Sequence, residues 1–173
     1  PRGHTDPHAF LIIENGQPGR SPLTWSVVGS GDFTGSGRSG VLWRDTSGNT
    51  VISTTNASGG IAASTFVVNL PAPWTVAGIG DFNGDGTADI LWRNAEGGVA
   101  MWRMNGNVQM GAAMIGLAPL EWAIAGVGDY SGDGKDDILW RNADGTLALW
   151  TMNGFGVMQQ QIISVVPTEW ELI

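Results

Sequence analysis

Two nine-residue segments of this chain share one pattern of acids and glycines, Asp-x-(Asn/Ser)-Gly-Asp-Gly-x-x-Asp. They are residues 81–89 (DFNGDGTAD) and 129–137 (DYSGDGKDD), which start 48 positions apart and run directly into Ile-Leu-Trp-Arg. Side-chain oxygens at loop positions 1, 3, 5 and 9, with glycine at position 6 for the sharp turn, suit a compact cage around a hard cation. Because the pattern returns with its flanking residues, the loop belongs to a repeated structural unit.

All nine tryptophans fall on positions of this repeat. Spaced by 48 or 49 residues, they form three series: Trp25, Trp74, Trp122 and Trp170; then Trp43, Trp92 and Trp140; then Trp102 and Trp150. An arginine directly follows each member of the second series, at Arg44, Arg93 and Arg141. We therefore divide a single propeller domain, or part of one, over residues 1–173 into a partial unit at 1–24, whole units at 25–73, 74–121 and 122–169, and the start of another unit at 170–173.

Within a unit the signals are those of short strands. In the third whole unit they predict strands over 122–128, 138–141, 146–152 and 162–166, with a hairpin turn at Asn153-Gly154. No segment shows helical spacing over ten or more residues. Glycine and alanine gather in the first strand of each unit, as expected where the innermost strands of neighbouring blades crowd together. Four short strands per unit predict an all-β fold, a β-propeller of four-stranded blades with three complete blades plus a split or partial one.

Three arrangements would complete the ring. The chain can be a piece of a longer ring, two copies can associate to close one ring, or the two ends can pair in one blade and close a small four-bladed ring. Residues 4–24 align with the second half of a unit and residues 170–173 with its beginning. Because open sheet edges favour aggregation, we expect one of the three arrangements to cover them.

Each of the two acidic loops is predicted to bind one Ca²⁺, an ion that takes six to eight oxygen ligands in flexible geometry. Mg²⁺ prefers to keep several waters, and zinc would call for nearby His or Cys, which are absent here. The predicted ligands are Asp81, Asn83, Asp85, the carbonyl of Thr87 and Asp89 in one loop, and Asp129, Ser131, Asp133, the carbonyl of Lys135 and Asp137 in the other.

Two comparisons within the sequence sharpen this prediction. An EF-hand needs Glu at loop position 12, where this chain has Trp92 and Trp140, so the helix-loop-helix interpretation is excluded. The first unit, residues 32–40, keeps the glycines but has Ser36 and Gly40 at positions 5 and 9 and adds the positive charge of Arg38. We expect no tight calcium binding there.

The repeated pattern G-x-G-D-F-N-G-D-G-x-x-D-I-L-W-R resembles the FG-GAP/VCBS repeat of calcium-binding β-propellers. That group includes the integrin α-subunit head, propeller lectins and many secreted bacterial proteins. The resemblance covers residues 25–173 well and residues 4–24 weakly. It implies calcium in the loop between the first and second strands of a blade, and a bacterial protein that is secreted or on the cell surface, although the chain shows no signal peptide.

The function we predict is lectin-like binding of a glycan or glycoprotein, through aromatic stacking and polar contacts. The candidate ligand-binding residues are Trp92, Arg93, Asn94, Trp140, Arg141 and Asn142. The competing interpretation is that these tryptophans pack between blades while each arginine pairs with a carboxylate. The alternative functions are a protein-interaction or adhesion scaffold with purely structural calcium, and part of a polysaccharide-active enzyme.

Composition narrows the partners further. The net charge is −8, so nucleic acid and anionic membrane surfaces are not expected partners. There is no run of 18 apolar residues that would insert into a membrane. His4 and His8 are the only histidines, and no catalytic constellation accompanies them. We therefore predict that the protein is not an enzyme.

Overall fold

The computed structural model describes residues 25–170, and this part of the chain is all-β, as predicted. It forms twelve strands in three antiparallel sheets of four strands each. The first sheet contains β1 (Trp25–Gly31), β2 (Gly40–Asp45), β3 (Asn49–Thr55) and β4 (Ile61–Asn69); the second contains β5 (Thr75–Gly80), β6 (Asp89–Arg93), β7 (Gly98–Asn105) and β8 (Val108–Leu117); the third contains β9 (Trp122–Gly128), β10 (Asp137–Asn142), β11 (Thr146–Asn153) and β12 (Gly156–Val165). The partial unit at 1–24, with His4 and His8, and residues 171–173 lie outside the described residues.

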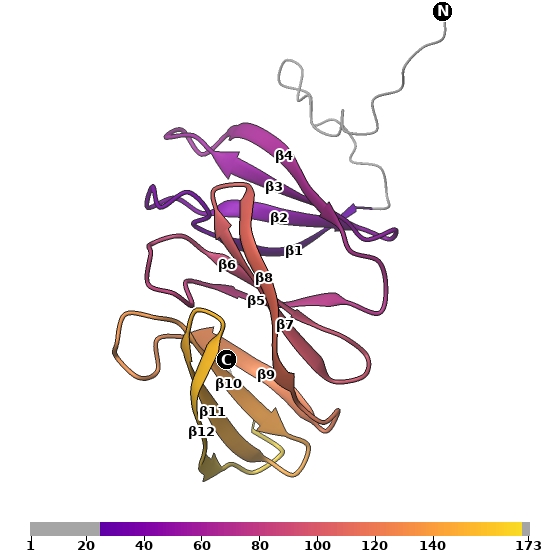
Figure 1. Ribbon diagram of the computed structural model, residues 1–173, viewed down its shortest axis with the longest axis vertical. Coiled ribbons are helices and arrows are strands. Elements are labelled where there is room, and N and C mark those ends of the chain that lie inside the picture. Colours follow the sequence, from indigo (N-terminus) through magenta and orange to yellow (C-terminus); the bar gives the residue numbers. More distant parts are fainter. Residues whose placement is uncertain (1–24, 171–173) are drawn as a thin grey trace, which may run out of the picture.

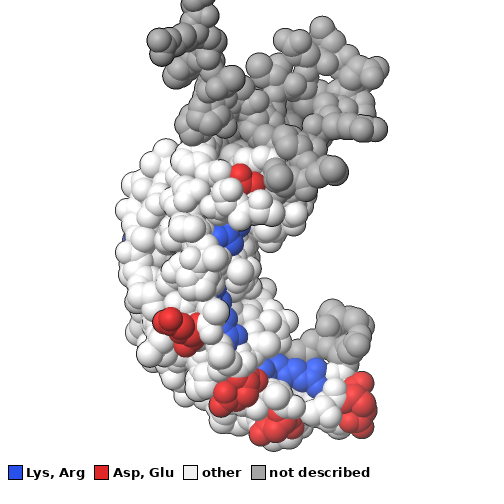
Figure 2. All heavy atoms as spheres, turned by 90° about the vertical axis from the view of Figure 1, so that its right-hand side faces the viewer, with Lys and Arg blue, Asp and Glu red and all other residues white. Residues whose placement is uncertain are grey.

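Each sheet is a meander in which strands adjacent in sequence are also adjacent in space. The three loops between the first and second strands, which contain the sequence motif or its degenerate form, project from the same side of the molecule, at the left of Figure 1. Seen from the opposite side, the described part is curved like a letter C, with basic side chains along its hollow (Figure 2). Within residues 25–170 the structure has no helix long and apolar enough to cross a membrane.

Two details of the third sheet differ from the sequence-based prediction. Strand β12 begins at Gly156 rather than at residue 162, because its first half, GVMQQQ, lies on the outer edge of the sheet, where exposure removes the apolar signal. The hairpin turn consists of Gly154 and Phe155 rather than of residues 153–154, since Asn153 is still paired with Gly156. Gly154 takes a positive φ of 59°, which glycine adopts without strain.

Each sheet has two different faces. In the second and third sheets the face that carries the second and third tryptophan series packs against the preceding sheet, and in the first and second sheets an aliphatic face packs against the following sheet. Between the first two sheets, Trp92 and Trp102 meet Leu42 and Ile52. The second and third sheets repeat this packing with equivalent residues: Trp140 and Trp150 against Leu91, Val99 and Met101.

The first strands of neighbouring sheets lie against each other, and their glycines make room for this contact. A Cβ atom on Gly78 would lie 2.7 Å from a methyl group of Val127, and one on Gly31 would lie 2.6 Å from a methyl group of Ile79. Neither distance is sterically tolerable. The crowding expected from the small residues of these strands is therefore present, and it brings the three loops close together.

Candidate functional site

The loop of residues 81–89, between β5 and β6, is folded around the carboxylate of Asp81. Its Oδ1 accepts backbone hydrogen bonds from Gly84 (2.8 Å) and Asp85 (3.1 Å), and its Oδ2 accepts one from Gly86 (2.7 Å). Gly84 and Gly86 have φ values of 75° and 84°, in the left-handed region that favours glycine. The first acid and the two glycines of the motif therefore fix the turn, whatever the loop binds.

Asp89 ends this loop and is fully buried, with 0% of its surface exposed. Its Oδ1 accepts a hydrogen bond from the backbone N–H of Met104 at 2.8 Å, whereas Oδ2 is buried without a hydrogen-bond partner. Burial, together with the charges of Asp85 and Asp81, raises the pKa of Asp89 to about 7, against the opposite effect of the backbone N–H groups of Met104 and Phe82. A buried carboxylate oxygen without a partner is costly, and a cation beside it would remove that cost.

The loop of residues 129–137, between β9 and β10, repeats the turn but differs in the hydrogen bonding of its last acid. Asp129 accepts backbone hydrogen bonds from Gly132, Asp133 and Gly134, as Asp81 does in its loop. Both oxygens of Asp137 have partners, Oδ1 the N–H of Met152 at 3.0 Å and Oδ2 the N–H of Ser131 at 2.8 Å.

Both loops present the oxygen donors that calcium takes, but their carboxylates do not converge. Within residues 25–170 no three His, Cys, Asp or Glu side chains gather as a metal-ligating group. The acids instead accept hydrogen bonds from their own loops, which leaves further lone pairs on the carboxylates. The donor chemistry fits Ca²⁺ in both loops, and the buried Oδ2 of Asp89 fits it best in the first of them.

The degenerate loop of the first unit, between β1 and β2, is closed without any further acid. Burial raises the pKa of Asp32, but hydrogen bonds from the backbone of Gly37, Ser36 and Thr34 outweigh this effect and hold that pKa below its ordinary value. The hydroxyl of Thr34 donates to that of Ser36 at 2.9 Å, and at the position of Ser36 the other two loops have an aspartate. The absence of tight calcium binding here stays a prediction.

Backbone hydrogen bonds tie each loop to the next one along the chain. Ala88 donates to the carbonyl of Asp32 at 2.9 Å, and Asp136, the equivalent residue one unit later, donates to the carbonyl of Asp81 at 2.8 Å. The side chain of Asp136 also accepts the N–H of Asp81 at 2.7 Å. Sequence reasoning missed Asp136. Its only signal was an acid directly before Asp137, where the other two units have Ser39 and Ala88, and that signal does not reveal a partner 55 residues away.

The six candidate ligand-binding residues have structural partners. Trp92 and Trp140 are 0% and 1% exposed and lie between the sheets. Asn94 accepts hydrogen bonds from the backbone of Glu96 and Gly98, and Asn142 accepts one from Asp144, so both amides stabilise the turn after the second strand. Ligand binding by these residues stays a prediction, and Trp140 lines a pocket between the second and third sheets.

The repeated arginines bind backbone carbonyls of the segment that leads into the next unit, including the carbonyl of the tryptophan at which that unit begins, rather than the carboxylates considered from sequence. Arg93 donates to the carbonyls of Trp122, Ala118 (3.2 Å) and Pro119 (2.9 Å). Its guanidinium also lies 5.2 Å from the ring centre of Trp140, within the range of a cation–π contact. Arg44 makes the equivalent contacts with Trp74, Leu70 and Trp92, and Arg141 those with Trp170 and Pro167.

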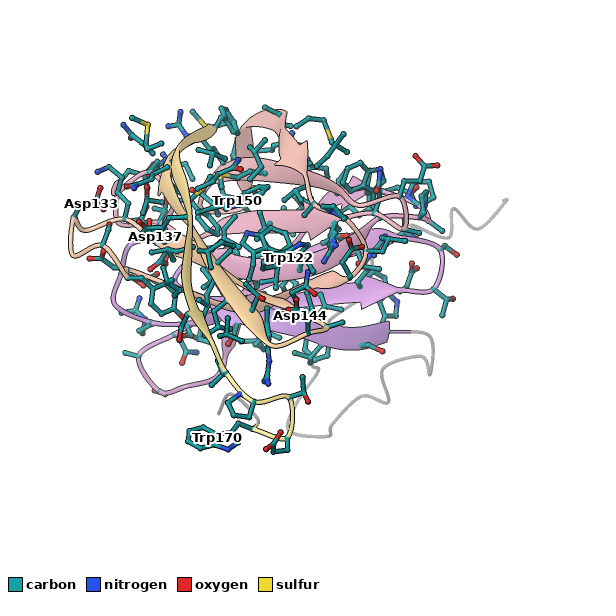
Figure 3. The ribbon with its side chains drawn as sticks, turned by 90° about the horizontal axis from the view of Figure 1, so that it is seen from below. Trp122, Asp133, Asp137, Asp144, Trp150 and Trp170 are labelled. Atoms are coloured by element: carbon teal, nitrogen blue, oxygen red, sulfur yellow. The ribbon has the colours of Figure 1, made fainter. Side chains whose placement is uncertain are left out.

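Two equivalent pockets open between the outer parts of neighbouring sheets. The pocket between the second and third sheets has a volume of about 270 Å³ and is lined by Trp122, Trp150 and the strand residues Gln160 and Gln161. Figure 3 shows Trp122 and Trp150 together, away from the loop that carries Asp133 and Asp137. The pocket between the first and second sheets, about 280 Å³, has Trp74 and Trp102 with Ala112 and Ala113 in place of the glutamines.

Comparison with known proteins agrees with the repeat. Residues 81–140 match the family described as FG-GAP-like repeat, which confirms the resemblance for this part of the chain. No curated protein matches the chain. Among solved structures, a chain of a mutant Photorhabdus luminescens Tc holotoxin pore is similar, with 14% sequence identity and a TM-score of 0.32, over 86% of this chain and 10% of that chain. The present chain therefore spans about a tenth of the length of that toxin chain.

Proposed function

We propose that the three sheets are consecutive blades of a calcium-binding β-propeller that serves as an interaction module. The observation that carries the propeller is an inter-sheet interface built twice from the same parts. In both interfaces a tryptophan pair packs against an aliphatic face, and an arginine of one sheet binds the carbonyl of the tryptophan at which the next unit begins. An interface that repeats with a fixed rotation generates a ring or a solenoid, and blades whose first strands crowd together favour the ring.

The two outer faces of the arc support a ring with further blades. The aromatic side chain at loop position 2 is covered by the following sheet at Phe33 (1% exposed) and Phe82 (0%), whereas Tyr130 is 48% exposed. At the other face, Trp43 is only partly buried, although its counterparts Trp92 and Trp140 are fully buried. Arg141 nevertheless holds the carbonyl of Trp170 at 2.5 Å, at the position where the next blade would start.

Calcium in this proposal has a structural role. Residues 81–89 would hold one ion through Asp81, Asn83, Asp85, Asp89 and the carbonyl of Thr87, and residues 129–137 would hold the other through the equivalent positions. When bound, the ion neutralises clustered carboxylates and stabilises glycine-rich turns whose ordering is entropically unfavourable. The loops are tied to each other and to the neighbouring hairpins, so each ion would stabilise an inter-sheet junction as well as its own turn.

A thermal melt tests the calcium proposal. We expect millimolar calcium to raise the Tm of the EDTA-treated chain by about 5 °C or more, since a ligand that binds only the folded state stabilises it. Asp85→Asn combined with Asp133→Asn should abolish this rise. The matched control, Glu96→Gln with Glu121→Gln, removes two charges from the opposite end of the sheets and should keep it. A calcium response that survives the aspartate variant, or that is missing in the unaltered chain, would contradict the proposal.

The interaction surface has a second candidate, a glycan, which the inter-sheet pockets favour. A pocket that combines tryptophan rings with amide side chains can stack on the apolar face of a sugar and bond to its hydroxyls. The pocket with Gln160 and Gln161 offers both features, whereas the one with Ala112 and Ala113 offers only the rings. We therefore place lectin-like binding, if the module recognises a glycan, in the pocket between the second and third sheets.

A glycan array in the presence of calcium separates the two candidates. Lectin-like binding predicts specific hits that weaken at least tenfold when Gln160 and Gln161 are both changed to alanine. Ala112→Thr is the control, because it alters the mouth of the equivalent pocket and should leave those hits unchanged. An array without hits would favour a module that recognises protein alone, which is the adhesion or scaffold alternative.

The remaining predictions from sequence also stand as proposals. We propose that the module is not an enzyme, that it does not bind nucleic acid or insert into membranes, and that it acts outside a bacterial cell or on its surface. Extracellular calcium would support sites of modest affinity, which suits exposed loops of this kind. Activity of the chain on a polysaccharide would contradict the first of these proposals.

A further inference from the structure

We propose that the residue at loop position 7 separates the calcium affinities of the two loops. In this proposal Lys135 weakens the site at 129–137, and the uncharged Thr87 leaves the site at 81–89 the stronger of the two. The loop of residues 81–89 would therefore fill first. This inference rests on the calcium binding proposed above and adds to it a residue that determines affinity.

Lys135 places its own cation on a predicted calcium ligand. Its Nζ lies 3.0 Å from Oδ2 of Asp133, and the two side chains are 24% and 46% exposed. The lysine stem packs against the neighbouring loop, where a Cβ atom on Gly84 would lie 3.3 Å from its Cγ. Calcium bound through Asp133 has to displace this ammonium group, which then remains beside the ion as a like charge.

Thr87 occupies the equivalent position and supports its loop without adding charge. Its hydroxyl donates to Oδ1 of Asp85 at 2.5 Å and lies 2.9 Å from the carbonyl of Met104. These contacts hold the Asp85 carboxylate at the loop. The charge of Arg103 also acts on this carboxylate, but within the described residues no ion pair forms with it. The two loops therefore differ in whether a cation is paired with the acid at loop position 5.

The last acid of each loop provides independent support. Oδ2 of Asp89 is buried without a hydrogen-bond partner, and a cation would satisfy it. Oδ2 of Asp137 already accepts the N–H of Ser131 at 2.8 Å, so a cation there gains less. Both observations favour the loop of residues 81–89. Because the lysine pair is exposed and screened by salt, we expect a difference in calcium dissociation constant of about three- to tenfold.

NMR resolves the two loops separately. The backbone amides of Gly86 and Gly134 donate to Asp81 and Asp129 at 2.7 Å and 2.9 Å, so each reports on its own loop. In a calcium titration of the ¹⁵N-labelled full chain, prepared free of metal, we expect the Gly86 signal to reach saturation at about three- to tenfold lower free calcium than the Gly134 signal.

Exchanging the two residues should shift the balance toward the loop of residues 129–137. In the double variant Thr87→Lys with Lys135→Thr, we expect the separation between the two signals to change in favour of Gly134 by more than in Lys135→Thr alone, while Asp89 still favours the loop of residues 81–89. Lys135→Thr alone should bring the two sites closer together, whereas Lys135→Arg keeps the charge and should leave the original order. The side chain of Lys135 is 24% exposed and its stem packs against the neighbouring loop, and Lys135→Arg keeps both the stem and the charge. The single variants at Lys135 therefore decide the question even if the change at Thr87, which contacts Met104, prevents folding.

The outcomes separate this inference from the proposal beneath it. If neither glycine signal moves in millimolar calcium, calcium binding itself is wrong, and the inference with it. If both signals move but saturate together, or if Lys135→Thr leaves their separation unchanged, calcium binding holds and the role of Lys135 is wrong.

Discussion

Replacing Trp92 with alanine is expected to lower the free energy of unfolding by about 3–5 kcal/mol. Its side chain is 0% exposed and fills the space between the first two sheets. The ring centre of Trp102 lies 4.8 Å from that of Trp92, and the guanidinium of Arg44 lies 5.3 Å from it on the other sheet. The substitution therefore removes an aromatic pair and a cation–π contact and leaves a large cavity. Urea unfolding at a fixed calcium concentration measures the loss.

Trp170→Ala is the matched control, because Trp170 is 63% exposed and its partner Arg141 binds the backbone carbonyl rather than the ring. We expect it to change the free energy of unfolding by less than about 0.5 kcal/mol. If Trp92→Ala does not fold, Trp92→Phe should fold with a smaller loss of unfolding free energy and should keep the order in which the two loops bind calcium. Equal effects at the two positions would mean that the repeated tryptophans do not build the inter-sheet interface.

The repeat made the all-β fold predictable because its tryptophans and glycines alternate with the period of a strand. Alternation identifies the two faces of a strand, but it does not say what covers each face. In this protein both faces of the second sheet are packed, so a tryptophan such as Trp92 is as buried as an aliphatic residue such as Leu91. Sequence alone therefore left ligand binding and core packing as competing interpretations for Trp92 and Trp140.

In the candidate site, too, contacts between residues close in sequence were predictable, whereas contacts between residues far apart in sequence were not. The turn of each loop is set within nine residues, and Asp81 with its two following glycines was predictable from their spacing. The contacts between loops, such as that of Asp136 with Asp81, join residues 55 positions apart. Likewise, the sequence gives no sign that Arg93 would bind carbonyls of the segment that leads into the third sheet, since any residue type can supply a backbone carbonyl.

Replacing Arg93 with alanine is expected to cost about 3 kcal/mol of the free energy of unfolding. The guanidinium donates to the carbonyls of Ala118, Pro119 and Trp122 and covers the ring of Trp140. Hydrogen bonds from a charged donor are stronger than neutral ones, and Ala118 is only 4% exposed, so its carbonyl would lose a partner that water replaces poorly. Arg93→Lys should recover part of the loss, because one ammonium cannot reach all three carbonyls in the geometry of the planar guanidinium.

Arg141→Ala supplies the matched comparison, since Arg141 makes the same kind of contact with Pro167 and Trp170 at the open end of the arc. Both carbonyls belong to exposed residues, so water can replace the arginine, and the expected loss is below about 1 kcal/mol. A loss at Arg141 equal to that at Arg93 would show that another sheet covers this end under the conditions of the measurement. Sedimentation of the unaltered chain then decides where the covering sheet comes from. A mass of two chains assigns it to a second copy, and the mass of one chain assigns it to closure within the chain itself.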